Sequence, residues 1–442
     1  MNIRFVIGYL LFSLMFALTG LSDELPRRSI SLDEALAMSA KSNYQLRIAQ
    51  AQYDEAKGQN LEAWSGFLPH FTISEQFVKS DDPVTVFGLK LKQGVFAETD
   101  FALSSLNAPD AFENYTTEFK IELPLINLDA IFGKAAAGMM AKAKQQGVER
   151  TRQAIAHQTR AAYFGLILTD QSRKAIDEAL KSAQAHRDDA KAAYDQGIIS
   201  QAEYLAAEVR LAELQEQQLL AENQVQNASD ALRLILGMEE STILQPTDTL
   251  SHIALQPENR KFESALLNRA DLLAIHFYQK AASRNLLAKS SAWLPRLNAF
   301  GMQEWNAADA FAKDADNYTV GVRLSWQLFD GLGHFGRRKQ AAAQKHQTSL
   351  QLQQATQQAR NEIGAAQRNL QVAEKRIAVA EQGVRQAKQS LHITEQRYRE
   401  GLEKTSDLLD REAMFTNAKL RLLKAKHDFQ LAVSQLNFAT GQ

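Results

Sequence analysis

The sequence predicts an α+β membrane protein in which a two-fold internal repeat supplies a long α-helical barrel of coiled-coil hairpins and four transmembrane β-strands per chain. Two observations predict this fold. First, landmarks recur at one spacing, because Gly197 and Gly401 lie 204 residues apart and so do Gly237 and Gly441. Second, each half contains a stretch of eleven residues in which apolar and polar side chains alternate, which is the period of a β-strand.

The composition excludes several classes of site. The 442-residue chain has a formal net charge of −1, with 50 Lys and Arg residues against 51 Asp and Glu residues, so nothing indicates a nucleic-acid partner. Cysteine is absent, which excludes disulfides, thiolate metal ligands, cysteine nucleophiles and lipid attachment through an N-terminal cysteine.

The first element expected along the chain is a secretory signal peptide at residues 1–22. Arg4 precedes the apolar run FVIGYLLFSLMFALTGLS, and small residues follow where cleavage is expected, between Thr19 and Ser22. A single membrane anchor is the alternative, but the apolar part of the run is shorter than the ~20 residues that a spanning helix needs. We therefore expect an exported chain.

The first repeat is expected over residues 23–240. After an initial helix it has strands near 68–80 and 115–126, a very long helix over 133–195 and a return helix over 200–236. This repeat has 23 more residues between its strands than the second repeat has. The surplus is rich in Asp, Pro and Gly, which predicts a loop over 80–114.

A connector over 241–258, which contains Pro246 and Pro257, separates the two repeats. The second repeat, 259–442, has the same order, with an initial helix, strands near 295–306 and 317–329, a long helix over 336–398 and a return helix over 405–438. The long helices contain no proline, and at ~1.5 Å per residue each extends roughly 95 Å. Such a length indicates a coiled coil or a helical barrel rather than a globular core.

The return helix of the second repeat has a coiled-coil seam, because its apolar and small residues recur with a mean period of 3.5. The seam consists of Phe415, Ala418, Leu422, Ala425, Phe429, Ala432 and Leu436. The remaining helical surface is rich in Gln, Lys, Arg and Glu. The sequence leaves open whether this polar surface is an ordinary solvated face or the wall of a water-filled interior.

The strand near 317–329 has the pattern of a strand that faces lipid on one side. One face carries Tyr318, Val320, Val322, Leu324, Trp326 and Leu328, and polar residues or glycine alternate with them. A transmembrane strand needs about 9–11 such residues, apolar outside and polar inside. A half-buried sheet in a soluble protein alternates in the same way, and this is the alternative.

Four strands from one chain cannot close a barrel. An open sheet cannot lie in lipid, because the hydrogen-bonding groups along its edges stay unpaired. A membrane location therefore requires an oligomer, and in a homotrimer three chains would complete a 12-stranded β-barrel.

Together these features resemble the TolC-like outer-membrane efflux protein family over essentially the whole mature chain. The resemblance rests on the paired Tyr-x-x-Gly turns Tyr194/Gly197 and Tyr398/Gly401, on the DLLD after the second turn, and on the glycine that closes each repeat. It implies a homotrimer in outer-membrane lipid of a Gram-negative bacterium, with a helical tunnel in the periplasm. It implies export of small molecules or proteins, together with a periplasmic adaptor (membrane fusion) protein and an inner-membrane pump, in tripartite efflux or type I secretion, without a cofactor.

The resemblance places the adaptor-docking tips at the two helical turns. The residues concerned are Tyr194, Gly197, Ile198, Ser200, Tyr398, Gly401, Leu402 and Ser406. A glycine between two helices is the usual left-handed residue at a helix C-terminus. The apolar residues beside it suit a partner surface and suit simple packing of the turn equally well.

In this family, acidic rings six and nine residues after the turn glycine line the tunnel constriction. Asp407 and Asp410 match both positions, and Glu203 matches the first of them in repeat one. The alternative is structural, because Thr405 or Ser406 can cap this helix and an acidic first turn favours the helix dipole.

The stretch SWQLFDGLGHFGRRK contains Gly331, Gly333 and Gly336 in the spacing of a dinucleotide-binding turn. That motif requires an acidic residue about 20 positions later, but after Asp330 none occurs until Glu362. The chain also contains no H-E-x-x-H, P-loop or G-x-S-x-G motif. We therefore expect neither an enzyme nor a cofactor or metal site.

We interpret the same stretch as the barrel-to-tunnel junction, where a membrane strand bends into a long helix. The junction residues of the two repeats are Phe132, Gly133, Asp330, Phe335 and Gly336. For the whole chain, a soluble periplasmic coiled-coil structural or adaptor protein is the alternative. It accounts for the export signal and the helices, but not for two matched hairpins with one apolar face.

Overall fold

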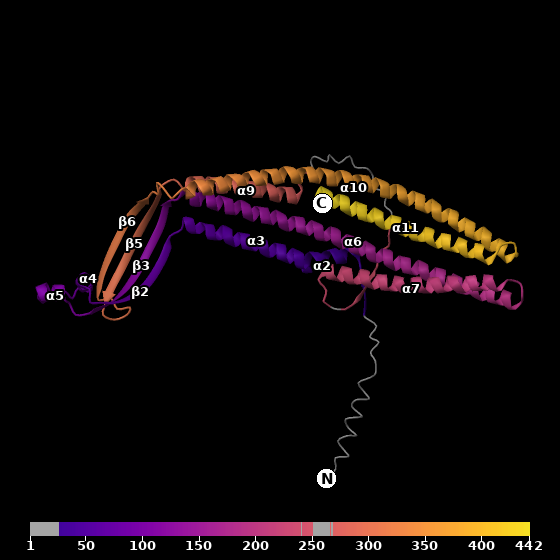
Figure 1. The fold of residues 1–442 in the computed structure, drawn as a ribbon, viewed down its shortest axis with the longest axis horizontal. Coiled ribbons are helices and arrows are strands. Elements are labelled where there is room, and N and C mark those ends of the chain that lie inside the picture. The colour runs from indigo at the N-terminus through magenta and orange to yellow at the C-terminus, as the bar shows by residue number, and fades with distance from the viewer. Residues whose placement is uncertain (1–25, 240, 251–265, 267) are drawn as a thin grey trace, which may run out of the picture.

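The computed structural model describes residues 26–239, 241–250, 266 and 268–442. The expected signal peptide, the second part of the expected connector and the start of the second repeat lie outside the described residues. Figure 1 shows two parts in the described chain, a long layer of helices that run side by side and a β-sheet at one end of that layer.

Two long helical hairpins form most of the layer. Their helices are α6 (Leu128–Asp195) with α7 (Gln201–Leu236), and α10 (Gly333–Arg399) with α11 (Thr405–Thr440). α6 has 68 residues and α10 has 67, so each extends about 100 Å at ~1.5 Å per residue. α6 begins five residues before, and α10 three residues before, the start expected from the sequence.

Near the sheet, shorter helices complete the layer. α3 (Tyr44–Glu62) packs against α6, and α9 (Ala270–Ser291) packs against both α6 and α10. α2 (Leu32–Ser42) precedes α3. Away from the sheet each long helix packs with its own return helix, and Phe429 of the predicted seam is buried there against Ile377.

A small parallel sheet fastens the start of the described chain to the middle of the layer. β1 (Arg27–Ile30) pairs with β4 (Ile243–Pro246), so part of the expected connector is a strand. Ile30 packs with Tyr163 of α6, whose hydroxyl donates to the Ile30 carbonyl at 2.9 Å and to the Asp248 carboxylate at 2.5 Å. Burial, aided by the bond to Asp248, raises the pKa of Tyr163 to about 12, so its hydroxyl stays protonated.

The large sheet is antiparallel throughout and has the strand order β2-β3-β5-β6. Its strands are β2 (His70–Ser80), β3 (Phe112–Ile126), β5 (Arg296–Ala307) and β6 (Ala315–Ser325). The hairpins of the two repeats meet at β3 and β5, which leaves β2 and β6 as edges. The alternation predicted that Trp326 and Leu328 belong to the last strand. This prediction is wrong, because β6 ends at Ser325 and both residues follow it.

The register gives the large sheet one apolar face. This face carries Phe71, Ile73, Phe77, Phe119, Ile121, Leu123, Tyr318, Val320, Val322 and Leu324. On the edge strands these side chains are exposed, from 51% for Phe77 to 75% for Tyr318. Glu75 also lies on this face, where its carboxylate accepts hydrogen bonds from Thr117 and from the Phe311 amide. An exposed apolar surface of this extent indicates a partner surface or lipid.

The surplus segment of the first repeat is helical, so the expected loop over 80–114 is wrong. It contains α4 (Pro83–Gln93), the 3₁₀ turn η2 (Glu98–Phe101) and α5 (Leu103–Asn107). The Asp82 carboxylate caps α4 by accepting from the Thr85 amide at 2.8 Å. Gly94 ends this helix with a φ of +70°. The Asp, Pro and Gly that indicated a loop are therefore the start and stop signals of a helix.

Candidate functional site

The two turns at the far end of the layer share one hydrogen-bond pattern. The Gly197 amide donates to the Tyr194 carbonyl at 2.8 Å, and the Ile198 amide donates to the Ala193 carbonyl at 2.9 Å. The same pair of bonds occurs 204 residues later, at Gly401 and Leu402. Both glycines have a left-handed backbone, with φ of +71° and +73°. Glycine adopts this conformation at little cost, which explains why it stands at both turns.

The aromatic and apolar residues of the turns divide into two groups. Tyr194 stacks on Tyr204 at a centroid distance of 5.7 Å, and the Tyr398 hydroxyl lies 3.4 Å from Thr405 Oγ1. These two contacts connect the end of each long helix with the start of its return helix. Ile198 and Leu402, by contrast, are 70% and 61% exposed, so they remain available to a partner.

Glu203 closes a helix cap. The Glu203 amide donates to Ser200 Oγ at 3.4 Å, and the Ser200 amide donates to Glu203 Oε2 at 3.0 Å. This reciprocal pair is a capping box at the start of α7. The Glu203 carboxylate is thus bonded at the helix terminus. This favours a structural role for Glu203 over the constriction role expected from the sequence.

Asp407 and Asp410 stand on the exposed face of the first turns of α11. Leu408 and Leu409, which lie between them, are buried, and Leu409 packs against Ala190 of α6. The expected caps are wrong, because Thr405 is buried inside the helix and the cap residue Lys404 makes no side-chain hydrogen bond. Of the structural alternative, the helix dipole remains, because Asp407 lies in the first turn of α11.

Two ion pairs near the far end join the hairpins and were not predicted from the sequence. His186 Nε2 lies 2.8 Å from Glu412 Oε1, and Lys419 Nζ lies 2.9 Å from Glu178 Oε2. The hydrogen bond to Glu412 raises the pKa of His186 above its usual value. The partners in each pair are more than 220 residues apart, so no local sequence pattern predicts them. They are brought together by the packing of α11 on α6.

The glycine-rich stretch forms a turn in which the Asp330 carboxylate lies at the N-terminus of α10. The Asp330 carboxylate accepts from the His334 amide at 3.0 Å and pairs with Arg337 at 2.5 Å, and these bonds hold the pKa of Asp330 below its usual value. Gly331 and Leu332 both have positive φ angles there. A carboxylate thus occupies the helix N-terminus where a dinucleotide would place its phosphate.

The other expected junction residues lie inside the helices. α6 begins directly after Asn127, so Phe132 and Gly133 belong to its second turn, and Phe335 and Gly336 belong to the first turn of α10. Near the bend of the first repeat, Asp129 pairs with Arg296 at the base of β5. The bend therefore occurs at Asn127 in repeat one and at 330–332 in repeat two.

α4 lies beside the end of the large sheet that is away from the helices (Figure 1) and contacts β3, β5 and β6. Gln93 is 8% exposed and donates to Asn114 Oδ1 at 2.8 Å and to the Ala307 carbonyl at 3.1 Å. Lys92 pairs with Glu304 at 3.0 Å. Because Asn114 and Glu304 project from the polar face, α4 lies opposite the apolar face.

Neither a metal-binding cluster nor a membrane-spanning helix is found in the part of the chain that the structure describes. No group of three His, Asp or Glu residues there could hold a metal ion. Within the same residues, none of the helices has both the length and the apolar character needed to span a membrane.

Comparison with known proteins matches both halves of the chain. The family model described as outer membrane efflux protein covers residues 35–238 and 262–442. The outer membrane protein TolC of Vibrio cholerae serotype O1 is 24% identical over 299 residues, which are 66% of this chain and 68% of that protein.

Solved structures of low sequence identity share the fold. A membrane protein from Pseudomonas aeruginosa superposes with a TM-score of 0.81 at 16% identity and covers 92% of both chains. The Campylobacter jejuni CmeC outer membrane channel gives 0.79 at 17% identity, over 93% of this chain and 85% of that one. The fold, the twin turns and the family match together show that the chain belongs to the outer membrane efflux protein family, whose members are TolC-type channels of the Gram-negative outer membrane and not enzymes.

Proposed function

We propose that three copies of this chain form an export channel, with a 12-stranded barrel in the outer membrane and a helical tunnel in the periplasm. The observation that carries the proposal is the large sheet, which combines an exposed apolar face with two unpaired edge strands, β2 and β6. Lipid offers no hydrogen-bond partners to a sheet edge. Pairing of β6 in one copy with β2 in the next satisfies both edges and leaves the apolar face in lipid.

In this arrangement the polar face of the sheet lines the pore. Arg296 projects from that face and pairs with Asp129, so the same side of α6 continues the pore wall into the tunnel. A polar cavity of about 620 Å³ lies on this side of the junction, and Lys289 and Arg337 are among its lining residues. An aqueous path would therefore run from the barrel along the helices.

At the periplasmic end, we propose that the exposed Ile198 and Leu402 meet the adaptor protein. Asp407 and Asp410 of three copies would place six carboxylates at the constriction of the tunnel. Both carboxylates are exposed on the side of α11 away from its buried leucines, which supports this assignment. The adaptor connects the channel to an inner-membrane pump, which supplies the cargo of small molecules or proteins.

Crosslinking tests the trimer directly, because the chain has no cysteine of its own. Thr72→Cys in β2 with Thr319→Cys in β6 places thiols on the polar side of both edges. In isolated outer membranes, a short bis-maleimide should give covalent dimers and trimers on a denaturing gel. As a matched control, Lys120→Cys with Met302→Cys joins the paired inner strands and should stay monomeric. Monomers alone from both variants would contradict the closed barrel.

A further inference from the structure

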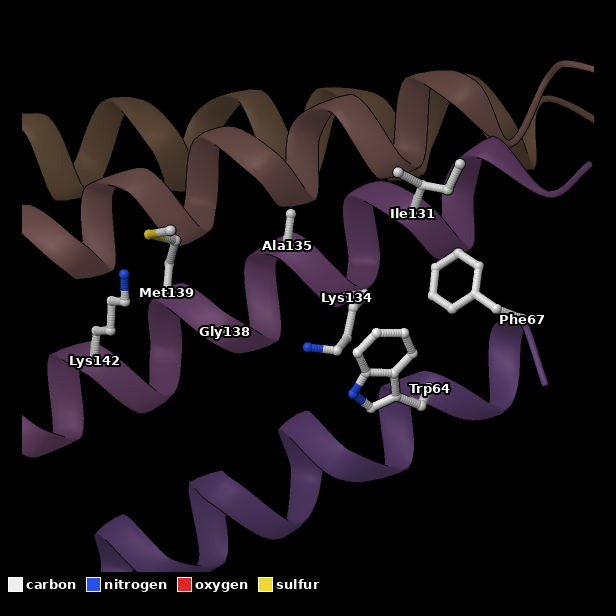
Figure 2. A pocket seen from close by; sticks show the side chains of 8 residues that line it. All are labelled: Trp64, Phe67, Ile131, Lys134, Ala135, Gly138, Met139 and Lys142. Carbon is white, nitrogen blue, oxygen red and sulfur yellow. The ribbon is translucent and has the colours of Figure 1, made fainter.

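A pocket beside the barrel-to-tunnel junction has the chemistry of a phospholipid headgroup site. It lies between η1 (Ala63–Gly66), the 3₁₀ turn that follows α3, and the first turns of α6, and its volume is about 430 Å³. Figure 2 shows its walls, which are Trp64 and Phe67 on one side and Ile131, Lys134, Met139 and Lys142 of α6 on the other. The lining combines a large apolar surface with two cationic side chains.

This pocket lies on the side of α6 away from the Asp129–Arg296 pair, whose arginine projects from the polar face of the sheet. Successive residues of an α-helix are about 100° apart, so Lys134 and Gly138 project roughly 140° and 180° away from Asp129. Both residues face Asn60 of α3. In the proposed channel, the pocket is therefore away from the residues of α6 that continue the pore wall.

The pocket also lies at the level of the membrane surface. The strands end where α6 begins, at Leu128, and Lys134 stands six residues further along, or ~9 Å down the helix axis. The headgroup region of one leaflet is about 5–8 Å thick. A flexible lysine stem extends the reach of its ammonium group further. Lys142 stands two turns deeper, so its ammonium belongs to the periplasmic side.

Lys134 has an ammonium group with capacity to bind an anion. It donates to Asn60 Oδ1 at 2.8 Å and lies 4.8 Å from the centre of the Trp64 ring. In the described part of the chain, no carboxylate forms an ion pair with Lys134 or Lys142. An ammonium group has three donors, so at least one remains for a phosphate oxygen.

A glycine sets how closely η1 approaches α6. A Cβ on Gly66 would lie 2.7 Å from the Ala130 Cβ, so only glycine lets η1 approach α6 this closely. This approach brings the Trp64 ring on one wall of the pocket close to the Lys134 ammonium on the other.

We propose that this pocket binds a phospholipid of the leaflet that faces the periplasm. Lys134 holds the phosphate, Trp64 lies at the headgroup level, and one acyl chain follows Phe67 and Ile131 toward the apolar face of the sheet. Tryptophan and lysine favour this interface because each has an apolar body and a polar end. The proposal rests on the proposed orientation of the barrel in the membrane.

Native mass spectrometry of the full protein in mild detergent tests the site. Phosphatidylglycerol added to the wild-type protein should give discrete lipid adducts, and Lys134→Gln should weaken this binding about fivefold. Lys289→Gln removes the same charge on the pore side and should leave binding unchanged. Lys142→Gln, two turns deeper, should have a smaller effect than Lys134→Gln.

Equal binding by wild-type protein and Lys134→Gln would overturn the proposal, and so would equal binding of phosphate-free diacylglycerol. Displacement of the lipid by millimolar inorganic phosphate would assign the site to free phosphate instead. The same spectra report the oligomeric mass, so a failed lipid site and a failed trimer are separate results. Unchanged mass and unfolding temperature for Lys134→Gln show that the variant is folded.

Discussion

Ser200 and Lys404 occupy equivalent positions in the two turns, 204 residues apart, but only Ser200 caps the helix that follows. Its partner in the cap is Glu203, whose equivalent in the second turn is Asp407. Asp407 makes no cap and points to solvent in the described chain. The same acidic position thus closes a helix cap in one repeat and makes no cap in the other.

Neutralising the free acidic pair should change how cations block the channel. In a trimer, Asp407 and Asp410 place like charges around one axis, which attracts multivalent cations. Asp407→Asn with Asp410→Asn should therefore weaken block by a trivalent cation at least about tenfold in planar bilayers.

The matched control for this experiment is Glu203→Gln. It removes the charge at the equivalent position, but that side chain closes a capping box, which Gln can also close, so both block and stability should persist. If the cation blocks the double variant as strongly as the wild type, Asp407 and Asp410 do not line the constriction and act only as charges at the start of α11.

At the scale of elements, sequence periodicity predicted the long helices and the strands but missed the helix α4, which depends on contacts with distant residues. The apolar periodicity of a long helix or an alternating strand repeats every few residues. The predicted bounds of these elements therefore lie within a few residues of the observed bounds. α4 shows the opposite case, because its Asp, Pro and Gly fit both a loop and a helix with caps. The helix is stabilised by hydrogen bonds from Gln93 to β3 and β5, which are distant from α4 in the sequence or contribute no local pattern.

The candidate site divides in the same way. The twin turns were predictable because two glycines and two tyrosines repeat at one spacing. The ion pair of His186 with Glu412 was not, because it forms only when α11 packs against α6. The pocket at Trp64 also lacked a sequence signal, since its walls come from residues about 70 positions apart.

Loosening α4 should widen the outer mouth of the barrel. Gln93 and the Lys92–Glu304 pair hold α4 on the polar face of the sheet, which lines the pore in the proposed channel. Gln93→Ala leaves buried polar partners unpaired, which costs about 1–3 kcal/mol locally, and Lys92→Ala removes the ion pair. The double variant should show higher conductance and greater entry of large hydrophilic solutes into cells.

Lys79→Ala is the control for the α4 experiment. Lys79 forms an exposed ion pair with Glu113 at the same end of the sheet. The substitution removes this ion pair but leaves the Glu113 carbonyl, which accepts a hydrogen bond from Gln93 of α4, in place. Conductance should stay at the wild-type value in this variant. An unchanged conductance in the double variant as well would show that α4 does not narrow the pore.

At the scale of the whole molecule, the internal repeat places two nearly identical tips side by side at the end of the helical layer (Figure 1). Three copies would present six tips, each with one exposed aliphatic residue beside a left-handed glycine. A ring of small apolar contacts suits an adaptor that is itself oligomeric, because weak contacts add when several engage together. Within one chain, the pairs His186–Glu412 and Lys419–Glu178 connect the two hairpins behind these tips.

Charged substitutions at the tips should therefore uncouple the channel from its adaptor while leaving the trimer intact. Ile198→Glu with Leu402→Glu replaces both exposed aliphatic side chains, each contributing about 1.5–3 kcal/mol when fully buried in an interface. Surface plasmon resonance with the purified adaptor should show affinity at least about tenfold lower. Ile198→Val with Leu402→Met keeps the apolar surface and should bind as the wild type does. Because the tips lie far from β2 and β6, edge crosslinking should be equal in all three proteins, and undiminished adaptor binding by the charged variant would mean that these residues only pack their own turns.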